Sequence, residues 1–153
     1  VTTLLEDAKG LAKVIDALAD RYRGQKLDAV VGVDARGFIL GGALAIALGV
    51  GFVPVRKKGK LPGATLRVEY ALEYGTDTVE IRAEALGEGK RVVVVDDLIA
   101  TGGTATAAAQ LARLRGADVV EACFIVELPD LKGRAKLEAQ KIAVHALCQY
   151  EGD

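Results

Sequence analysis

Apolar side chains recur along this chain in two alternating patterns, one typical of helices and one typical of buried strands. Leucine, isoleucine and alanine repeat at helical spacing over residues 4–22, after a Thr3-x-x-Glu6 capping box. Short runs of β-branched residues follow, and they predict strands at 28–34, 52–56, 91–97, 119–128 and 142–147. Three further segments have helical patterns, at 38–48, 102–115 and 131–139. The alternation predicts an α/β fold in which a central parallel five-stranded sheet is flanked by helices.

The middle of the chain departs from this alternation. Residues 57–64 are basic and contain glycine and proline, which is typical of a mobile loop. Residues 65–74 and 78–82, with a glycine-containing turn between them, predict a hairpin-like excursion. We therefore expect one domain over residues 1–153, with a flexible, hairpin-like loop at 57–82.

The run from residue 92 to residue 104 is the most informative part of the sequence. It opens with four consecutive valines, as in a strand buried on both faces, and Asp96 and Asp97 then place two carboxylates where we expect the strand to end. A loop of small residues follows, and an alanine-rich helical pattern begins directly after it. Because ligands of open α/β sheets bind at the carboxyl edge of the strands, we expect a binding site here.

That loop, here called the phosphate loop, consists of Ala100, Thr101, Gly102, Gly103 and Thr104. Its glycines let the backbone approach a phosphate closely, and the N–H groups of the loop and of the helix start can bind it, with two threonine hydroxyls as further donors. The two aspartates repel phosphate but can accept hydrogen bonds from vicinal hydroxyls. The run thus predicts a site for a ribose 5-phosphate group. The nucleotide-binding patterns G-x-x-x-x-G-K-[ST] and G-x-G-x-x-G do not occur.

The same run resembles the phosphoribosyl-diphosphate signature of the type I phosphoribosyltransferases. Further segments resemble successive motifs of the adenine phosphoribosyltransferases, in the same order along the chain: Asp34-Ala35-Arg36-Gly37-Phe38, the stretch 55–63, Leu72-Glu73-Tyr74-Gly75, Leu131-Lys132-Gly133-Arg134 and Gln149-Tyr150-Glu151. The resemblance covers about residues 2–151. It implies the type I fold and transfer of the 5-phosphoribosyl group from 5-phosphoribosyl 1-diphosphate to adenine, which yields AMP and pyrophosphate in purine salvage.

The resemblance also assigns binding roles. Asp96 and Asp97 would hold the 2′- and 3′-hydroxyls of the ribose, and residues 34–37 would form a pyrophosphate loop, often with a cis peptide bond. At the start of a helix the Arg36 cation opposes the helix dipole, so an anionic ligand is expected beside it. Cations stabilise a departing diphosphate, and its binding is assigned to Ala35, Arg36, Arg56, Lys57 and Lys60.

Glu73 is the candidate catalytic residue. In the adenine enzymes that the chain resembles, this glutamate lies on a flexible loop that closes over the site and exchanges a proton with N7 of the base. A carboxyl group enclosed in a dry site has a raised pKa, which suits general acid–base catalysis. Tyr74 and Leu98 are assigned to the loop and the vicinity of the base. Mg²⁺ is the implied cofactor, held mainly by the substrate, and no protein ligand of the metal is assigned.

Composition and charge indicate which partners and which cellular compartment to expect. Of the 153 residues 51% are hydrophobic and 27% are charged, and the net charge of -1 indicates neither a nucleic-acid nor a membrane partner. Two cysteines are too few for a disulfide framework and no signal peptide is visible, so we expect a reducing cytoplasm. His145, Cys123 and Cys148 are expected in strands or the core, without a functional role. The family is commonly homodimeric, which implies a homodimer here.

Two alternatives to adenine transfer stay open at this point. The chain begins with Val-Thr-Thr and contains no methionine, so we expect it to lack the N-terminal hood segment that covers the base in the adenine enzymes. Without those base contacts, another purine such as hypoxanthine, guanine or xanthine is the first alternative. The second is a non-catalytic regulatory domain that senses phosphoribosyl diphosphate. The motif around Glu73 and the lack of a basic DNA-binding extension favour an enzyme.

Overall fold

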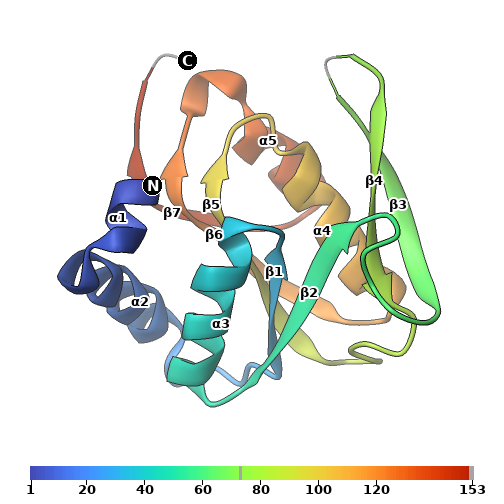
Figure 1. Cartoon of the computed structure of the whole chain (residues 1–153), viewed down its shortest axis with the longest axis horizontal. Coiled ribbons are helices and arrows are strands. Elements are labelled where there is room, and N and C mark those ends of the chain that lie inside the picture. The colour runs from blue at the N-terminus through green and yellow to red at the C-terminus, as the bar shows by residue number, and fades with distance from the viewer. Residues whose placement is uncertain (73, 152–153) are drawn as a thin grey trace.

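Five parallel strands form the centre of the structure, and their carboxyl ends lie on the same side of the sheet (Figure 1). The computed structural model describes residues 1–72 and 74–151. The parallel strands are β1 (Ala29–Val33), β2 (Gly51–Lys57), β5 (Arg91–Ile99), β6 (Asp118–Glu127) and β7 (Val144–Gln149). The prediction of an α/β fold with these five strands is therefore confirmed.

The predicted five-stranded sheet is nevertheless incomplete, because two more strands extend it. β3 (Thr65–Ala71) and β4 (Thr76–Arg82) form an antiparallel hairpin, and β4 pairs with the edge of β2 through Arg56–Glu80 and Lys57–Val79. Within the described residues the sheet is thus mixed and seven-stranded, in the order β3-β4-β2-β1-β5-β6-β7. Without β4, the end of β2 would leave unpaired backbone N–H and C=O groups at the edge of the sheet.

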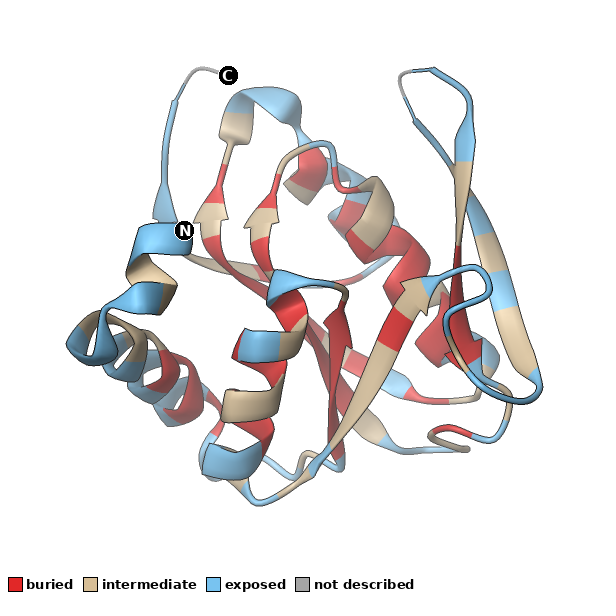
Figure 2. Cartoon of the chain, viewed as in Figure 1, coloured by how far each residue is buried: buried red, intermediate tan, exposed pale blue. Residues whose placement is uncertain are grey.

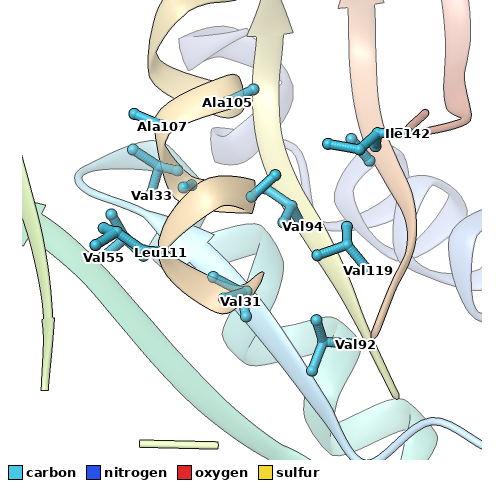
Figure 3. Packing of buried hydrophobic residues seen from close by; sticks show 14 of the residues in the cluster. Val31, Val33, Val55, Val92, Val94, Ala105, Ala107, Leu111, Val119 and Ile142 are labelled. Carbon is cyan, nitrogen blue, oxygen red and sulfur yellow. The ribbon is translucent and has the colours of Figure 1, made fainter. Parts of the chain in front are cut away.

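Helices cover both faces of the sheet. α2 (Ala8–Tyr22) and α3 (Arg36–Leu48) pack on the face that carries Val93 and Val95, and α4 (Gly103–Leu114) packs on the face that carries Val92 and Val94. Successive strand residues point to opposite faces, which explains why the whole valine run is buried (Figure 2). Figure 3 shows side chains of α4 packed against side chains of the strands, on the face that carries Val92 and Val94. A short 3-10 helix, η1 (Pro129–Leu131), and α5 (Gly133–Ala139) connect β6 to β7.

Several element boundaries differ from the prediction. The helix expected over residues 4–22 is broken at Asp7 into α1 (Thr2–Glu6) and α2, and Asp7 caps α2 by accepting a hydrogen bond from the Lys9 N–H at 3.2 Å. β5 continues two residues past its predicted end at Asp97, because its backbone keeps pairing with β6 as far as Ile99. Asp96 and Asp97 therefore lie within the strand, and the phosphate loop begins directly after its last residue, Ile99.

The cysteines and the histidine lie on β6 and β7. Cys123 is fully buried, and His145 beside it is half-buried, so burial lowers the pKa of its imidazole. Cys148, which was expected in the core, is exposed, because β7 is the last strand of the sheet and is uncovered near its end. Among the helices in the described part of the chain, none is both long enough and apolar enough to cross a membrane.

Candidate functional site

The phosphate loop joins the carboxyl end of β5 to the start of α4. Gly102 is the N-cap of α4 and has a φ of +83°, a conformation that favours glycine. In the described structure no side chain caps this helix start, which leaves N–H groups of its first turn available to an anion. The Thr106 hydroxyl donates to the Gly102 carbonyl at 2.6 Å and holds the turn. The loop lines a cavity of about 120 Å³ together with Asp96, Leu98, Ile99 and Ala105.

The two predicted ribose-binding acids have different surroundings. Asp96 lines the cavity at the loop and accepts a hydrogen bond from the Asp97 N–H at 2.8 Å. Burial, together with a hydrogen bond between the two side chains, raises the pKa of the Asp96 carboxyl to about 8. Asp97 is only 4% exposed, and its carboxylate forms an ion pair with Arg36, whose pKa this hydrogen bond raises. Of the two acids, Asp96 thus lines the cavity at the phosphate loop, while Asp97 is paired with Arg36.

The pyrophosphate loop, residues 34–37, lies beside the phosphate loop because β1 and β5 are neighbours in the sheet. Its Asp34–Ala35 peptide bond is cis, as the resemblance implies. A Cβ on Gly37 would lie 2.9 Å from the Val95 carbonyl oxygen, so the close approach of α3 to β5 requires glycine at this position. The structure therefore brings the two loops, which are more than 60 residues apart in sequence, to one edge of the sheet.

The predicted basic residues beyond Arg36 lie at different distances from this edge. Arg56 donates from Nε to the Asp34 carboxylate at 2.9 Å, so it contacts the pyrophosphate loop directly. Lys57 lines a second cavity, of about 250 Å³, which Asp34, Asp96 and Thr104 also line, and its ammonium group is paired with the Asp77 carboxylate of the hairpin. Lys60 lies in the exposed turn after β2 and does not line this cavity.

The hairpin forms another wall of the site. Tyr70, Ala71 and Leu72 line a cavity of about 550 Å³ with three residues of the phosphate loop, and Lys136 of α5 completes its lining. Tyr70 and Lys136 are not among the predicted site residues, because their closeness to the loop depends on how the hairpin and α5 pack around α4. No local pattern in the sequence indicates that packing.

Three predicted residues remain: Glu73, assigned to proton transfer, and Tyr74 and Leu98, assigned to the loop and the vicinity of the base. Glu73 lies outside the described residues. Tyr74 is 87% exposed, so it is not packed against the site. Leu98 lines the cavity at the phosphate loop, next to Asp96. Of the residues assigned to the base, the structure thus brings Leu98 to the phosphate loop.

The oxygen donors at the site fit a magnesium ion that the substrate helps to hold. Mg²⁺ usually binds through one or two carboxylates plus substrate phosphates, and it keeps several waters. Asp96 offers one cavity-facing carboxyl group, while the Asp97 carboxylate is engaged by Arg36. Across residues 1–72 and 74–151, no three His, Cys, Asp or Glu side chains are grouped so that they could hold a metal by themselves.

Comparisons with known proteins agree with this geometry. The chain matches the family model of the phosphoribosyl transferase domain over residues 1–149. It therefore belongs to the phosphoribosyltransferase family. It is 55% identical over 152 residues to the adenine phosphoribosyltransferase of Chelativorans sp. (strain BNC1), a match that covers 99% of this chain and 84% of that protein.

Solved structures of adenine phosphoribosyltransferases have the same fold. The enzyme from Thermoanaerobacter pseudethanolicus matches with a TM-score of 0.93 and 49% identity, over 97% of this chain and 86% of that chain. The enzyme from Trypanosoma brucei, in complex with AMP, pyrophosphate and ribose-5-phosphate, matches with a TM-score of 0.91 and 33% identity, over 97% and 68% of the two chains. The predicted family and its adenine branch are confirmed by these relatives.

Proposed function

We propose that this protein is a purine-salvage transferase that moves the 5-phosphoribosyl group from 5-phosphoribosyl 1-diphosphate to adenine, giving AMP and pyrophosphate. The observation that carries this proposal is the uncharged phosphate loop with Asp96 beside it, at the same sheet edge as the pyrophosphate loop. Together these elements offer one place for a phosphate, one for ribose hydroxyls and one for a diphosphate. Sequence identity of 55% to an adenine phosphoribosyltransferase supports adenine as the base.

The proposed placement of the substrate follows from the chemistry of the two loops. The 5-phosphate takes the N–H groups and hydroxyls of residues 100–104, and the ribose hydroxyls donate to Asp96, with Asp97 as a second acceptor. The diphosphate lies against the backbone of Ala35 and the side chain of Arg36. Arg56, Lys57 and Lys60 add positive charge on the same side.

In the proposed reaction the bond from C1 of the ribose to the diphosphate oxygen breaks, and a bond from C1 to N9 of adenine forms. The bonding electron pair leaves with the diphosphate, so Arg36 and the basic residues of the β2 end stabilise developing negative charge. Adenine that reacts at N9 carries its proton at N7, and Glu73 accepts this proton, so that the base of AMP is neutral. When bound, Mg²⁺ neutralises part of the diphosphate charge. Closure of the hairpin formed by β3 and β4 over the site would exclude water and so prevent hydrolysis of the sugar.

We also propose that the protein is a homodimer in a reducing cytoplasm. Ile39 and Ile46 lie seven residues apart on one face of α3 and are 50% and 84% exposed, which is a large apolar surface for one helix. Both cysteines are free thiols. Light scattering should give the mass of two chains, and Ile46→Lys should give the mass of one.

The experiment for the proposed function measures pyrophosphate release from 5-phosphoribosyl 1-diphosphate and Mg²⁺ with single purine bases. Glu73→Gln should lower kcat with adenine by about 100-fold or more, because general acid–base catalysis contributes about that much. Glu69→Gln is the matched control, since Glu69 is an exposed carboxylate on the same hairpin, and it should leave kcat unchanged.

Each outcome of this experiment has a definite meaning. Turnover with adenine alone supports the adenine assignment. Turnover with guanine, hypoxanthine or xanthine keeps the transferase and rejects adenine as its base. If no base is turned over while ribose 5-phosphate still binds, the enzymatic function is wrong and a sensing domain takes its place.

A further inference from the structure

The first residue of α5 contacts the phosphate loop backbone to backbone. A Cβ on Gly133 would lie 2.4 Å from the Ala100 carbonyl oxygen and 3.0 Å from the Gly102 nitrogen. Conversely, a Cβ on Gly102 would lie 2.9 Å from the Gly133 carbonyl oxygen. Real side chains do not approach backbone atoms so closely, so each position admits only glycine while the other stays in place. The path of the phosphate loop is therefore tied to the position of α5.

The next residue, Arg134, fixes that position. Its Nη2 lies 2.7 Å from Oε1 of Glu127 and its Nε lies 3.1 Å from Oε2, while Nη1 donates to the Val144 carbonyl at 2.7 Å. Glu127 is only 3% exposed and also accepts a hydrogen bond from the Gln149 amide at 3.0 Å. Arg134 thus joins α5 to the end of β6 by a forked, charge-assisted contact and to the start of β7 by a hydrogen bond.

The carboxylate that holds Arg134 is itself attached to the strand that leads into the phosphate loop. Glu127 is the register partner of Ile99, the last residue of β5, and the Leu128 N–H donates to the Ile99 carbonyl at 3.0 Å. The phosphate loop is therefore held from two directions. β5 enters it beside Glu127, and α5 lies against it through Gly133.

A second ion pair on β6 provides a comparison. Arg21 of α2 donates to both carboxylate oxygens of Glu121 at 2.7 Å, and the Tyr22 hydroxyl donates to the same carboxylate at 2.6 Å. Both glutamates are buried, and both arginines are about one-third to two-fifths exposed. Only the Arg134 pair is connected to the phosphate loop, since Arg21 lies on the opposite face of the sheet.

On the basis of the proposed function, we infer that Gly133 and Arg134 are positioning residues for the 5-phosphate site. Gly133 sets the backbone of residues 100–102, and the Arg134–Glu127 pair holds Gly133 in place. Neither residue needs to touch the substrate. Their loss should weaken the binding of a sugar phosphate and leave the binding of pyrophosphate, at the neighbouring loop, nearly unchanged.

The test measures the Kd of two probes, ribose 5-phosphate and pyrophosphate with Mg²⁺, by titration calorimetry, along with the Tm of each variant. Arg134→Met should raise the Kd of ribose 5-phosphate about tenfold, since hydrogen bonds to charged groups are worth about that factor. The Kd of pyrophosphate should change by less than about twofold on the same reasoning. Arg21→Met should lower the Tm to a similar extent and leave both Kd values unchanged. Arg134→Lys, which keeps one contact to Glu127, should restore part of the affinity.

A second variant tests Gly133 independently of the ion pair. Gly133→Ala forces the phosphate loop to shift and should raise the Kd of ribose 5-phosphate by about tenfold or more, since losing a hydrogen bond to a charged group costs about that factor. Gly51→Ala is the matched control, because a Cβ there meets nothing within 4 Å, and it should not alter either Kd.

Three results would overturn the inference. The first is a Kd for ribose 5-phosphate that stays at the wild-type value in Gly133→Ala and Arg134→Met. The second is an equal loss of affinity for both probes, which is the signature of general destabilisation. The third is the same selective loss in Arg21→Met. By contrast, a wild-type protein that binds neither probe would reject the proposed function itself.

Discussion

The two loops at the carboxyl edge of the sheet are built on opposite principles. The pyrophosphate loop contains Asp34 and Arg36, and each of these is already in an ion pair, with Arg56 and Asp97 respectively. The phosphate loop contains no charged residue, and its shape depends on Gly102, on the start of α4 and on the backbone of Gly133. One loop is thus organised by side-chain charge and the other by backbone geometry.

This difference indicates how each loop should respond to a ligand. Arg36 is already paired with the Asp97 carboxylate, so an incoming diphosphate shares this guanidinium with an existing ion pair. The phosphate loop has its N–H groups in place before the ligand arrives and therefore loses little conformational entropy on binding. Substitutions at the first loop should act through charge, and those at the second should act through shape.

The largest effect is expected for Gly102→Ala in the phosphate loop. Alanine would be strained at a φ of +83°, and its Cβ would lie 2.9 Å from the Gly133 carbonyl oxygen. We expect kcat/KM for 5-phosphoribosyl 1-diphosphate to fall by about 100-fold or more, because the N–H groups that bind the phosphate are displaced. Steady-state kinetics with saturating adenine would measure this.

Gly49→Ala is the control for this substitution. Gly49 also has a positive φ, +71°, but a Cβ there meets nothing within 4 Å. The variant should lose about 1 kcal/mol of stability from the same backbone strain, and its kcat/KM should stay at the wild-type value. If the two variants lost activity equally, a preformed phosphate loop would not explain the binding.

A smaller effect is expected for Arg36→Ala in the pyrophosphate loop. Loss of one charge-assisted contact should raise the Kd of pyrophosphate by about ten- to thirtyfold and leave the Kd of ribose 5-phosphate nearly unchanged. Arg36→Lys should recover part of this affinity, since it keeps the charge without the forked geometry. Calorimetry with each probe would distinguish the loops.

The dependence of binding on ionic strength should also differ between the two loops. The Arg36 side chain is about half exposed, so added salt should weaken pyrophosphate binding in the wild type more than in Arg36→Ala. Arg23→Ala removes an exposed ion pair on α2, far from the site, and should leave both Kd values at the wild-type level. A ribose 5-phosphate Kd that rises as much as that of pyrophosphate in Arg36→Ala would contradict separate roles for the two loops.

The sequence indicates the two loops more reliably than it indicates what holds them. Consecutive valines predict β5 as a buried strand, and small residues after it predict the phosphate loop, since both signals lie within about a dozen neighbouring residues. The Arg36–Asp97 pair, the Lys57–Asp77 pair and the Gly133 contact each join segments separated by at least 20 residues. The pairing of β4 with β2 is likewise a tertiary contact. Local patterns carry no information on these contacts, which appear only when the chain is folded.

The smallest effect is expected for Asp96, which lies between the two loops. Its side chain can carry a charge, but its protonation depends on how deeply the surrounding structure buries it. Its pKa rises from an ordinary value of 3.8 to about 8 in the folded protein, chiefly through burial. Between pH 4 and pH 8 the folded chain therefore binds more protons at this site than the unfolded chain does. The free energy of unfolding should fall as the pH rises through this window and become level above it. In Asp96→Asn that decrease should be smaller by more than about 1 kcal/mol, the equivalent of about one pKa unit. Urea denaturation at pH 5 and pH 8 would measure the free energy of unfolding of both proteins. An equal change between the two pH values in the wild type and in Asp96→Asn would show that Asp96 is already ionised at neutral pH. In that case burial would not control the protonation of this acid.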